Sequence, residues 1–234
     1  MADYRFTSWF GIRTGKVKTT FGLYNDSQDV DFLRVFALLP QSIYPTDLRD
    51  TTIAHAGGDL YGHVALPHRL GDLSYTAYAG HRNDGMYSGY PYLVSQWGVF
   101  FRSLGGLQYG GDLRWNTPVK GLLIGASRMN QEITGKGSFV NLLNPSAGLL
   151  PYRTSTTDYW TNQFYGEYRA GKLDLNAEYR RYFNRTPYAP GAGSVETDVR
   201  GWYVSGAYRL GKRVEIGSYY SHYSVTSQPP AWRC

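Results

Sequence analysis

Between Asp158 and Tyr223 the sequence alternates strictly between apolar and polar side chains, in runs joined by short turns. One such run reads Leu173, Asp174, Leu175, Asn176, Ala177, Glu178, Tyr179 and Arg180. A side-chain period of two indicates a β-strand whose two faces meet different surroundings. Because one face is charged and the other carries large aromatic residues near the strand ends, the pattern predicts a transmembrane β-barrel with a water-filled interior.

Alternation alone does not say which face is wet, because a soluble barrel or sandwich would give the same pattern with its apolar face inward. The length of the strands and the width of the lumen both favour a membrane barrel over a soluble one. The strand from Trp160 to Tyr168 spans roughly 26 Å, or about 20 Å when tilted, close to the apolar height of an outer membrane. A barrel of about ten or more strands also has a lumen too wide for Leu, Ala and Gly to fill. We therefore expect Leu175 to face outward and Glu178 to face inward.

About ten strands are expected, and the connections between them alternate between short and long. Residues 1–234 are interpreted as one antiparallel up-and-down barrel domain, with long loops at about 19–57, 81–106, 129–157 and 184–198. Short turns at one rim and long loops at the other are typical of bacterial outer-membrane barrels, whose turns face the periplasm.

The composition fits this interpretation. Charged residues make up 18% of the chain, and it holds 22 Tyr and 28 Gly, which suit aromatic girdles and curved strands. The single cysteine, Cys234, excludes an intramolecular disulfide. The formal charge of +6 would suit nucleic acid, an acidic membrane surface or an anion-favouring pore. Lys and Arg are scattered along the strands and turns rather than clustered on one element, so we expect no nucleic-acid partner.

Neither end of the sequence resembles the end of a closed barrel. Residues 1–6 lack the basic and apolar segments of a signal peptide, and residues 228–234 resemble a loop. We therefore expect a fragment, an open arc whose edges are residues 2–6 and 213–224. Open edges leave backbone N–H and C=O groups unpaired, which is costly in lipid.

Three segments resemble known proteins. They are Gly11–Asp26 (GIRTGKVKTTFGLYND), Leu38–Tyr44 (LLPQSIY) and Gly57–Gly62 (GGDLYG). The first resembles a segment of Gram-negative outer-membrane porins, including the phosphate-selective group, and the other two resemble a constriction loop and the strand after it. The resemblance implies a barrel of about sixteen strands, more than this chain supplies. For the full-length protein we expect a homotrimer in the bacterial outer membrane.

The sequence offers little sign of catalysis. The histidines show no metal-ligand spacing; they are His55, His63, His68, His81 and His222. Ser221 and His222 are the only adjacent hydroxyl and imidazole, and neighbours on a strand point to opposite faces. We therefore expect no enzyme, no metal and no cofactor.

The predicted function is passive diffusion of small hydrophilic solutes, with a weak preference for anions. The alternative is a non-conducting barrel whose long loops bind an external partner. The predicted pore-lining residues are Asp112, Arg114, Gln163, Glu167, Arg169, Asp174, Asn176, Glu178, Arg180, Arg209 and Glu215. The predicted constriction residues are Lys16, Lys18, Arg34, Gln41 and Tyr44. The aromatic girdle, in contact with outer-membrane lipid, is predicted at Trp115, Trp160, Tyr168, Trp202 and Tyr208.

Overall fold

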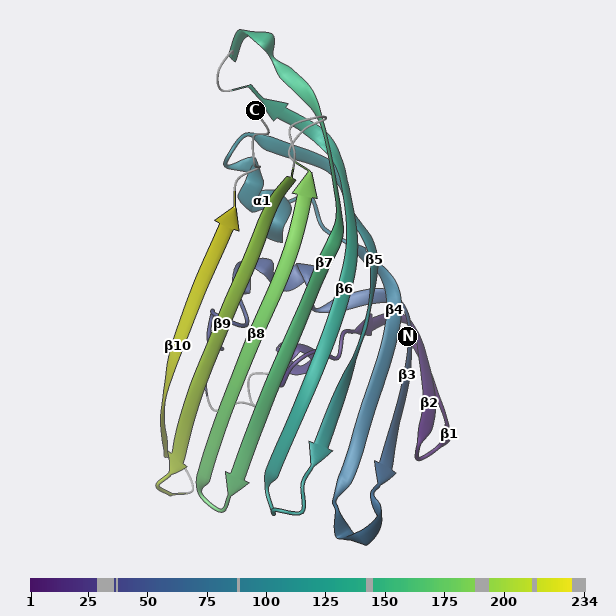
Figure 1. Cartoon of the computed structure of the whole chain (residues 1–234), viewed down its shortest axis with the longest axis vertical. Helices are drawn as coiled ribbons and strands as arrows, with labels where there is room; N and C mark the ends of the chain where they lie inside the picture. Colours follow the sequence, from purple (N-terminus) through teal and green to yellow (C-terminus); the bar gives the residue numbers. More distant parts are fainter. Residues whose placement is uncertain are drawn as a thin grey trace.

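Ten antiparallel strands form one sheet in chain order (Figure 1). The structure is a computed structural model and describes residues 1–28, 36, 38–87, 89–141, 145–187, 194–211 and 214–228. The strands are β1 (Ala2–Thr7), β2 (Phe10–Lys18), β3 (Ala54–Ala65), β4 (Asp72–Asn83), β5 (Val99–Asn116), β6 (Leu122–Val140), β7 (Leu149–Ala170), β8 (Leu173–Pro187), β9 (Ser194–Arg209) and β10 (Glu215–Gln228). The up-and-down order of ten strands confirms the predicted all-β architecture.

The sheet is open. Strand β1 pairs with β2 and β10 pairs with β9, and within the described residues no ladder joins β1 to β10. The two expected edges are therefore the edges of the sheet. No helix in the described parts of the chain is long and apolar enough to cross a membrane.

The connections are short at one end of the sheet and longer at the other, as Figure 1 shows. One short turn holds the 3-10 helix η4 (Pro67–Arg69), where His68 and Arg69 adopt positive φ of 55° and 60°. The other end carries α1 (Gly89–Ser95) between β4 and β5, and the 3-10 helix η5 (Pro145–Ala147) between β6 and β7.

Three of the long connections are shorter than predicted. Strand β6 continues to Val140 and β7 begins at Leu149, so most of the predicted 129–157 loop is paired strand. The predicted 81–106 and 184–198 loops are likewise shortened by β4, β5, β8 and β9. Strands of 18, 19 and 22 residues in β5, β6 and β7 exceed the ~9–11 that a tilted strand needs to span a bilayer. In these paired extensions the apolar–polar alternation fades, so the sequence pattern predicted loops there.

The described residues of the longest connection, 19–28, 36 and 38–53 between β2 and β3 (the 19–53 connection), lie against one face of the sheet (Figure 1). We call this the inner face, and the opposite one the outer face. The connection includes the 3-10 helices η1 (Asn25–Ser27) and η3 (Thr46–Thr51), and α1 contacts η3.

The side chains of β8 show how the alternation divides between the two faces. Asn176 and Glu178 lie on the inner face and are 6% and 3% exposed, whereas Leu175 and Tyr179 lie on the outer face and are 42% and 37% exposed. These faces are the ones expected from the sequence. On the inner face, Leu39, Ile43 and Tyr44 of the 19–53 connection form a buried cluster with Tyr203 of β9.

Candidate functional site

The 19–53 connection is anchored to the inner face by a small apolar cluster. Leu39, Ile43 and Tyr44 from the connection pack with Tyr203 of β9, and Tyr24 packs against them. The rings of Tyr24 and Tyr44 meet edge to face at 6.1 Å. The cluster places polar atoms of the connection beside polar side chains of β7, β8 and β9.

Glu178 is the centre of the polar contacts that follow. Its carboxylate accepts hydrogen bonds from the Tyr44 hydroxyl at 2.8 Å and the Tyr203 hydroxyl at 2.6 Å. The backbone N–H of Leu23 donates at 3.2 Å, and the side-chain amide of Gln163 donates as well. Burial raises the pKa of the Tyr44 hydroxyl well above its usual value, as does the neighbouring carboxylate, so Tyr44 stays a donor. A buried carboxylate is thus satisfied by neutral donors from both the wall and the connection.

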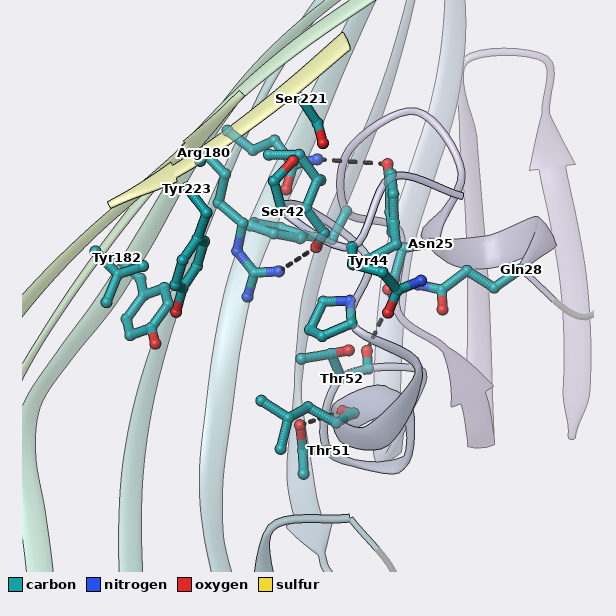
Figure 2. Close-up of a pocket in the computed structure, with 18 of the residues that line it drawn as sticks. Asn25, Gln28, Ser42, Tyr44, Thr51, Thr52, Arg180, Tyr182, Ser221 and Tyr223 are labelled. Atoms are coloured by element: carbon teal, nitrogen blue, oxygen red, sulfur yellow. Dashed lines mark hydrogen bonds between the residues drawn. The ribbon is translucent and has the colours of Figure 1, made fainter. Parts of the chain in front are cut away.

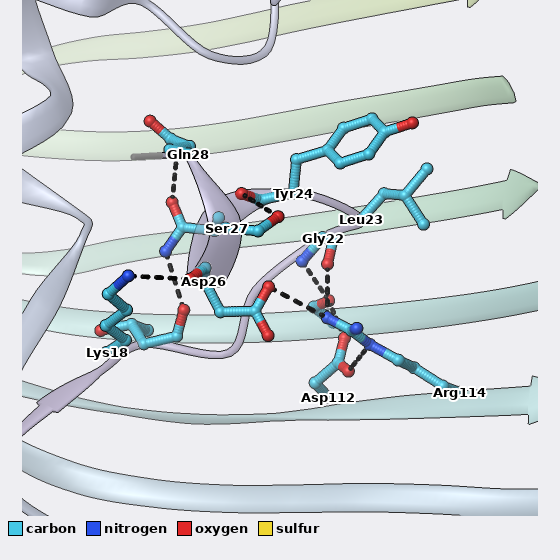
Figure 3. Close-up of polar contacts among 12 residues, drawn as sticks. Lys18, Gly22, Leu23, Tyr24, Asp26, Ser27, Gln28, Asp112 and Arg114 are labelled. Atoms are coloured by element: carbon cyan, nitrogen blue, oxygen red, sulfur yellow. Dashed lines mark hydrogen bonds and ion pairs between the residues drawn. The ribbon is translucent and has the colours of Figure 1, made fainter. Parts of the chain in front are cut away.

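A second anchor joins Gly22 to β5 and β6, as Figure 3 shows. Arg114 donates to the Gly22 carbonyl at 2.9 Å and to Asp112 at 2.8 Å, and lies 3.8 Å from Asp26. The Gly22 N–H donates to the Ser127 hydroxyl at 2.9 Å. Gly22 has a φ of +68°, the left-handed region that glycine adopts without strain. The backbone can therefore turn close against the wall here.

A third anchor lies where the connection leaves β2. Gln108 donates to the Thr19 hydroxyl oxygen at 3.1 Å, and this hydroxyl is hydrogen-bonded to Nδ1 of His55 at 3.0 Å. The Asp59 carboxylate can only accept, so Nε2 of His55 donates to it at 2.8 Å. Arg13 forms an ion pair with the other Asp59 oxygen at 3.0 Å.

A cavity of about 420 Å³ remains between the 19–53 connection and β7–β10. Figure 2 shows Arg180, Tyr182 and Tyr223 on the wall side and Tyr44 and Thr52 on the connection side. The cavity therefore has a cation, aromatic rings and hydroxyl groups on its surface.

Arg180 is the cation of this cavity. Its guanidinium donates to the Ile43 carbonyl at 2.8 Å and lies 5.7 Å from the Tyr182 ring. Within the described residues Arg180 has no carboxylate partner, and its buried Nε has no hydrogen-bond acceptor. A guanidinium in this state can bind an anion.

The structure divides the predicted pore-lining residues into three groups. Asp112, Arg114, Gln163, Asn176, Glu178 and Arg180 lie on the inner face, most of them under the 19–53 connection. Glu167, Arg169 and Asp174 form an ion-pair cluster, with Arg169 at 2.7 Å from Glu167 and 3.0 Å from Asp174. Arg209 and Glu215 form an exposed pair at 3.7 Å between β9 and β10. That these residues line a pore stays a prediction.

The predicted constriction residues do not form one set. Tyr44 is buried at the Glu178 anchor, and Gln41 lines the cavity. Lys18 donates to the Asp26 carbonyl at 3.2 Å. The placement of Lys16 was wrong: Val17 is buried with His55 on the inner face, so the neighbouring Lys16 points outward. Arg34 lies outside the described residues.

The predicted girdle residues all fall on outer-face positions in the strand registers; they are Trp115, Trp160, Tyr168, Trp202 and Tyr208. Their contact with lipid stays a prediction. The residues that the sequence did not single out are Gly22, Tyr203 and Thr19. Their partners are distant in sequence, and only the LLPQSIY resemblance pointed to an inward loop. No group of three or more metal-ligating side chains occurs in the described ranges.

No protein-family model matches this sequence, and no curated protein matches it. A solved structure described as outer-membrane expressed OmpT of Vibrio cholerae matches with a TM-score of 0.54 and 15% sequence identity. The match covers 96% of this chain and 58% of that chain, so this chain spans little more than half its length. The likeness shows that the chain has the fold of an outer-membrane β-barrel.

The expectation that the chain is not an enzyme is overturned. The chain shares its fold with OmpT, and one fold carries different functions in different proteins, so the barrel gives no ground for excluding catalysis. The structure also contains a hydrogen-bonded hydroxyl–imidazole–carboxylate chain of Thr19, His55 and Asp59 that the sequence did not predict. Thr19 and His55 are 36 positions apart, so their contact leaves no local pattern in the sequence. All three residues are buried, at 0%, 1% and 2% exposure.

Proposed function

We propose that this chain forms the wall and the constriction of a porin. A porin is a passive diffusion pore for small hydrophilic solutes in the bacterial outer membrane. The observation that carries the proposal is the 19–53 connection held on the inner face by Glu178 and Arg114. A connection fixed on that face narrows the space inside the curved sheet while leaving the Arg180 cavity beside it. Diffusion pores obtain selectivity from such narrowed, charged regions.

The proposal includes a weak preference for anions. Arg180 supports it, because this cation faces the cavity without a carboxylate partner in the described residues. A few charges in a narrow, low-dielectric passage focus the field and raise the local concentration of counter-ions. The resemblance to phosphate-selective porins suggests inorganic phosphate as a preferred anion, and a homotrimer as the assembly of the full-length protein.

Recordings on the purified full-length protein in planar lipid bilayers test this function. We expect stepwise conductance, a reversal potential in a KCl gradient on the anion-selective side, and a reduction of chloride current by added phosphate. Protein unfolded before addition is the control for leaks. Folded protein that inserts without conducting would contradict the pore and favour long loops that bind an external partner.

A further inference from the structure

Three arginines form a row across the outer face. The strand registers place Arg128 of β6 opposite Asn162 of β7, Asn162 opposite Arg181 of β8, and Arg181 opposite Arg200 of β9. Arg128 is exposed, and the side chains of Arg181 and Arg200 are 41% and 55% exposed. We call Arg128, Arg181 and Arg200 the arginine row.

The row lies between aromatic positions of the outer face, with the stacked rings of Trp160 and Phe183 two residues further toward the longer connections. Two residues nearer the short turns, the outer positions are Phe164, Tyr179 and Trp202, which lie side by side in the registers. Phe164 is 56% exposed and Tyr179 is 37% exposed. Two strand residues span about 7 Å, so the cations lie directly above exposed aromatic rings, on the side of the longer connections.

The row carries more positive charge than its neighbours neutralise. Arg181 and Arg200 are directly opposite, an arrangement that destabilises a sheet when the charges are alike. Asp198 forms an ion pair with each of them, at 2.8 Å from Arg181 and 3.2 Å from Arg200. Arg128 donates to the amide oxygens of Asn162 and Asn130, and in the described residues it has no carboxylate partner. In the described residues, Arg181 and Arg200 therefore share one carboxylate and Arg128 has none.

Trp160 holds two members of the row in place. The guanidinium carbons of Arg128 and Arg181 lie 5.4 and 5.5 Å from the centre of its ring. Cations at this distance from an indole ring are attracted by its π-electrons. The two guanidinium groups are therefore positioned before any ligand arrives, which reduces the entropy lost on binding.

We propose that the arginine row binds the anionic phosphate headgroup of a membrane lipid, whose acyl chains lie along Phe164, Tyr179 and Trp202. Guanidinium groups bind phosphate through paired, charge-assisted hydrogen bonds, and a phosphate supplies the negative charge that the row lacks. The inference rests on the membrane location in the proposed function but not on conduction.

The test measures lipid binding to the purified full chain in dodecyl maltoside micelles by native mass spectrometry. The probes are dioleoyl phosphatidic acid and dioleoyl phosphatidylcholine, which carry the same acyl chains, and inorganic phosphate. We expect phosphatidic acid to bind most tightly. Replacing the row with glutamine (R128Q, R181Q and R200Q together) should weaken its binding by about 100-fold, since each cation near an anionic lipid contributes several-fold. Replacing the row with lysine should weaken it less.

Arg185→Gln is the matched control. Arg185 lies on the same face of β8, four residues beyond Arg181, but it already contacts Glu196 at 2.9 Å and Asp158 at 3.7 Å. Phosphatidic acid binding should change less than twofold in this variant. Three outcomes would overturn the inference: phosphatidylcholine binds as tightly as phosphatidic acid, inorganic phosphate binds as tightly as phosphatidic acid, or the glutamine triple variant binds phosphatidic acid as tightly as the original protein. Selective lipid binding without conductance would contradict only the proposed diffusion pore. Conductance without selective lipid binding would contradict only the proposed binding of a lipid phosphate by the arginine row.

Discussion

The Tyr44 hydroxyl donates to the Glu178 carboxylate at 2.8 Å, joining the 19–53 connection to the centre of β8 across 134 residues of sequence. Both side chains are buried, at 5% and 3% exposure. A buried carboxylate without donors would be costly, so this contact fixes where the connection lies.

Replacing Tyr44 with phenylalanine should therefore loosen the connection. The variant removes one donor from Glu178 and leaves the ring in place, and we expect the free energy of unfolding to fall by about 1–3 kcal/mol. Urea unfolding of protein folded into vesicles measures the loss. Tyr24→Phe is the control, because the Tyr24 hydroxyl makes no hydrogen bond within the described residues although its ring contacts Tyr44. Equal losses in the two variants would contradict the role given to the hydroxyl.

Replacing Gly22 with alanine tests the close approach of the backbone to the wall. A Cβ at this position would meet the side chains of Gln163 and Glu178, and the positive φ adds backbone strain. Gly148 has a similar φ of +70° but open space around a Cβ, so Gly148→Ala carries the strain without the contact. We expect Gly22→Ala to cost about 1–3 kcal/mol more than Gly148→Ala in the same unfolding measurement. A difference near zero would mean that the connection moves away without cost.

The strand pattern could be predicted from sequence because each strand carries its own signal. The alternation predicts the faces of Leu175 and Glu178. Gly171 predicts the turn after Ala170. The partners of the 19–53 connection could not be predicted, because alternation fixes the face of Glu178 but not which distant residue covers it. The face of Lys16 was mispredicted, because its neighbour Val17, paired with His55 in the register, is the buried residue on the inner face.

Replacing Leu175 with arginine tests the outer face. Leu175 lies midway along the apolar part of β8, and an arginine near the middle of a bilayer costs about 2–4 kcal/mol. We expect that loss of stability in vesicles, together with a lower yield of folded protein. Leu210→Arg is the control, because Leu210 is exposed in the short turn after β9, where a charge meets water. A smaller loss for Leu175→Arg than for Leu210→Arg would place the outer face in water.

Replacing Arg180 with glutamate tests the origin of the anion preference. The variant reverses the charge that faces the cavity, and we expect the ratio of chloride to potassium permeability to fall on the order of tenfold, enough to favour cations. Reversal potentials in a KCl gradient measure the ratio. Arg180→Lys keeps the charge and should keep the preference, which separates charge from the lost hydrogen bond to Ile43. Arg209→Glu makes the same charge change on the inner face, but Arg209 is 59% exposed near the short turns, where salt screens it. An equal shift in Arg180→Glu and Arg209→Glu would show that net charge, rather than the cavity, sets selectivity.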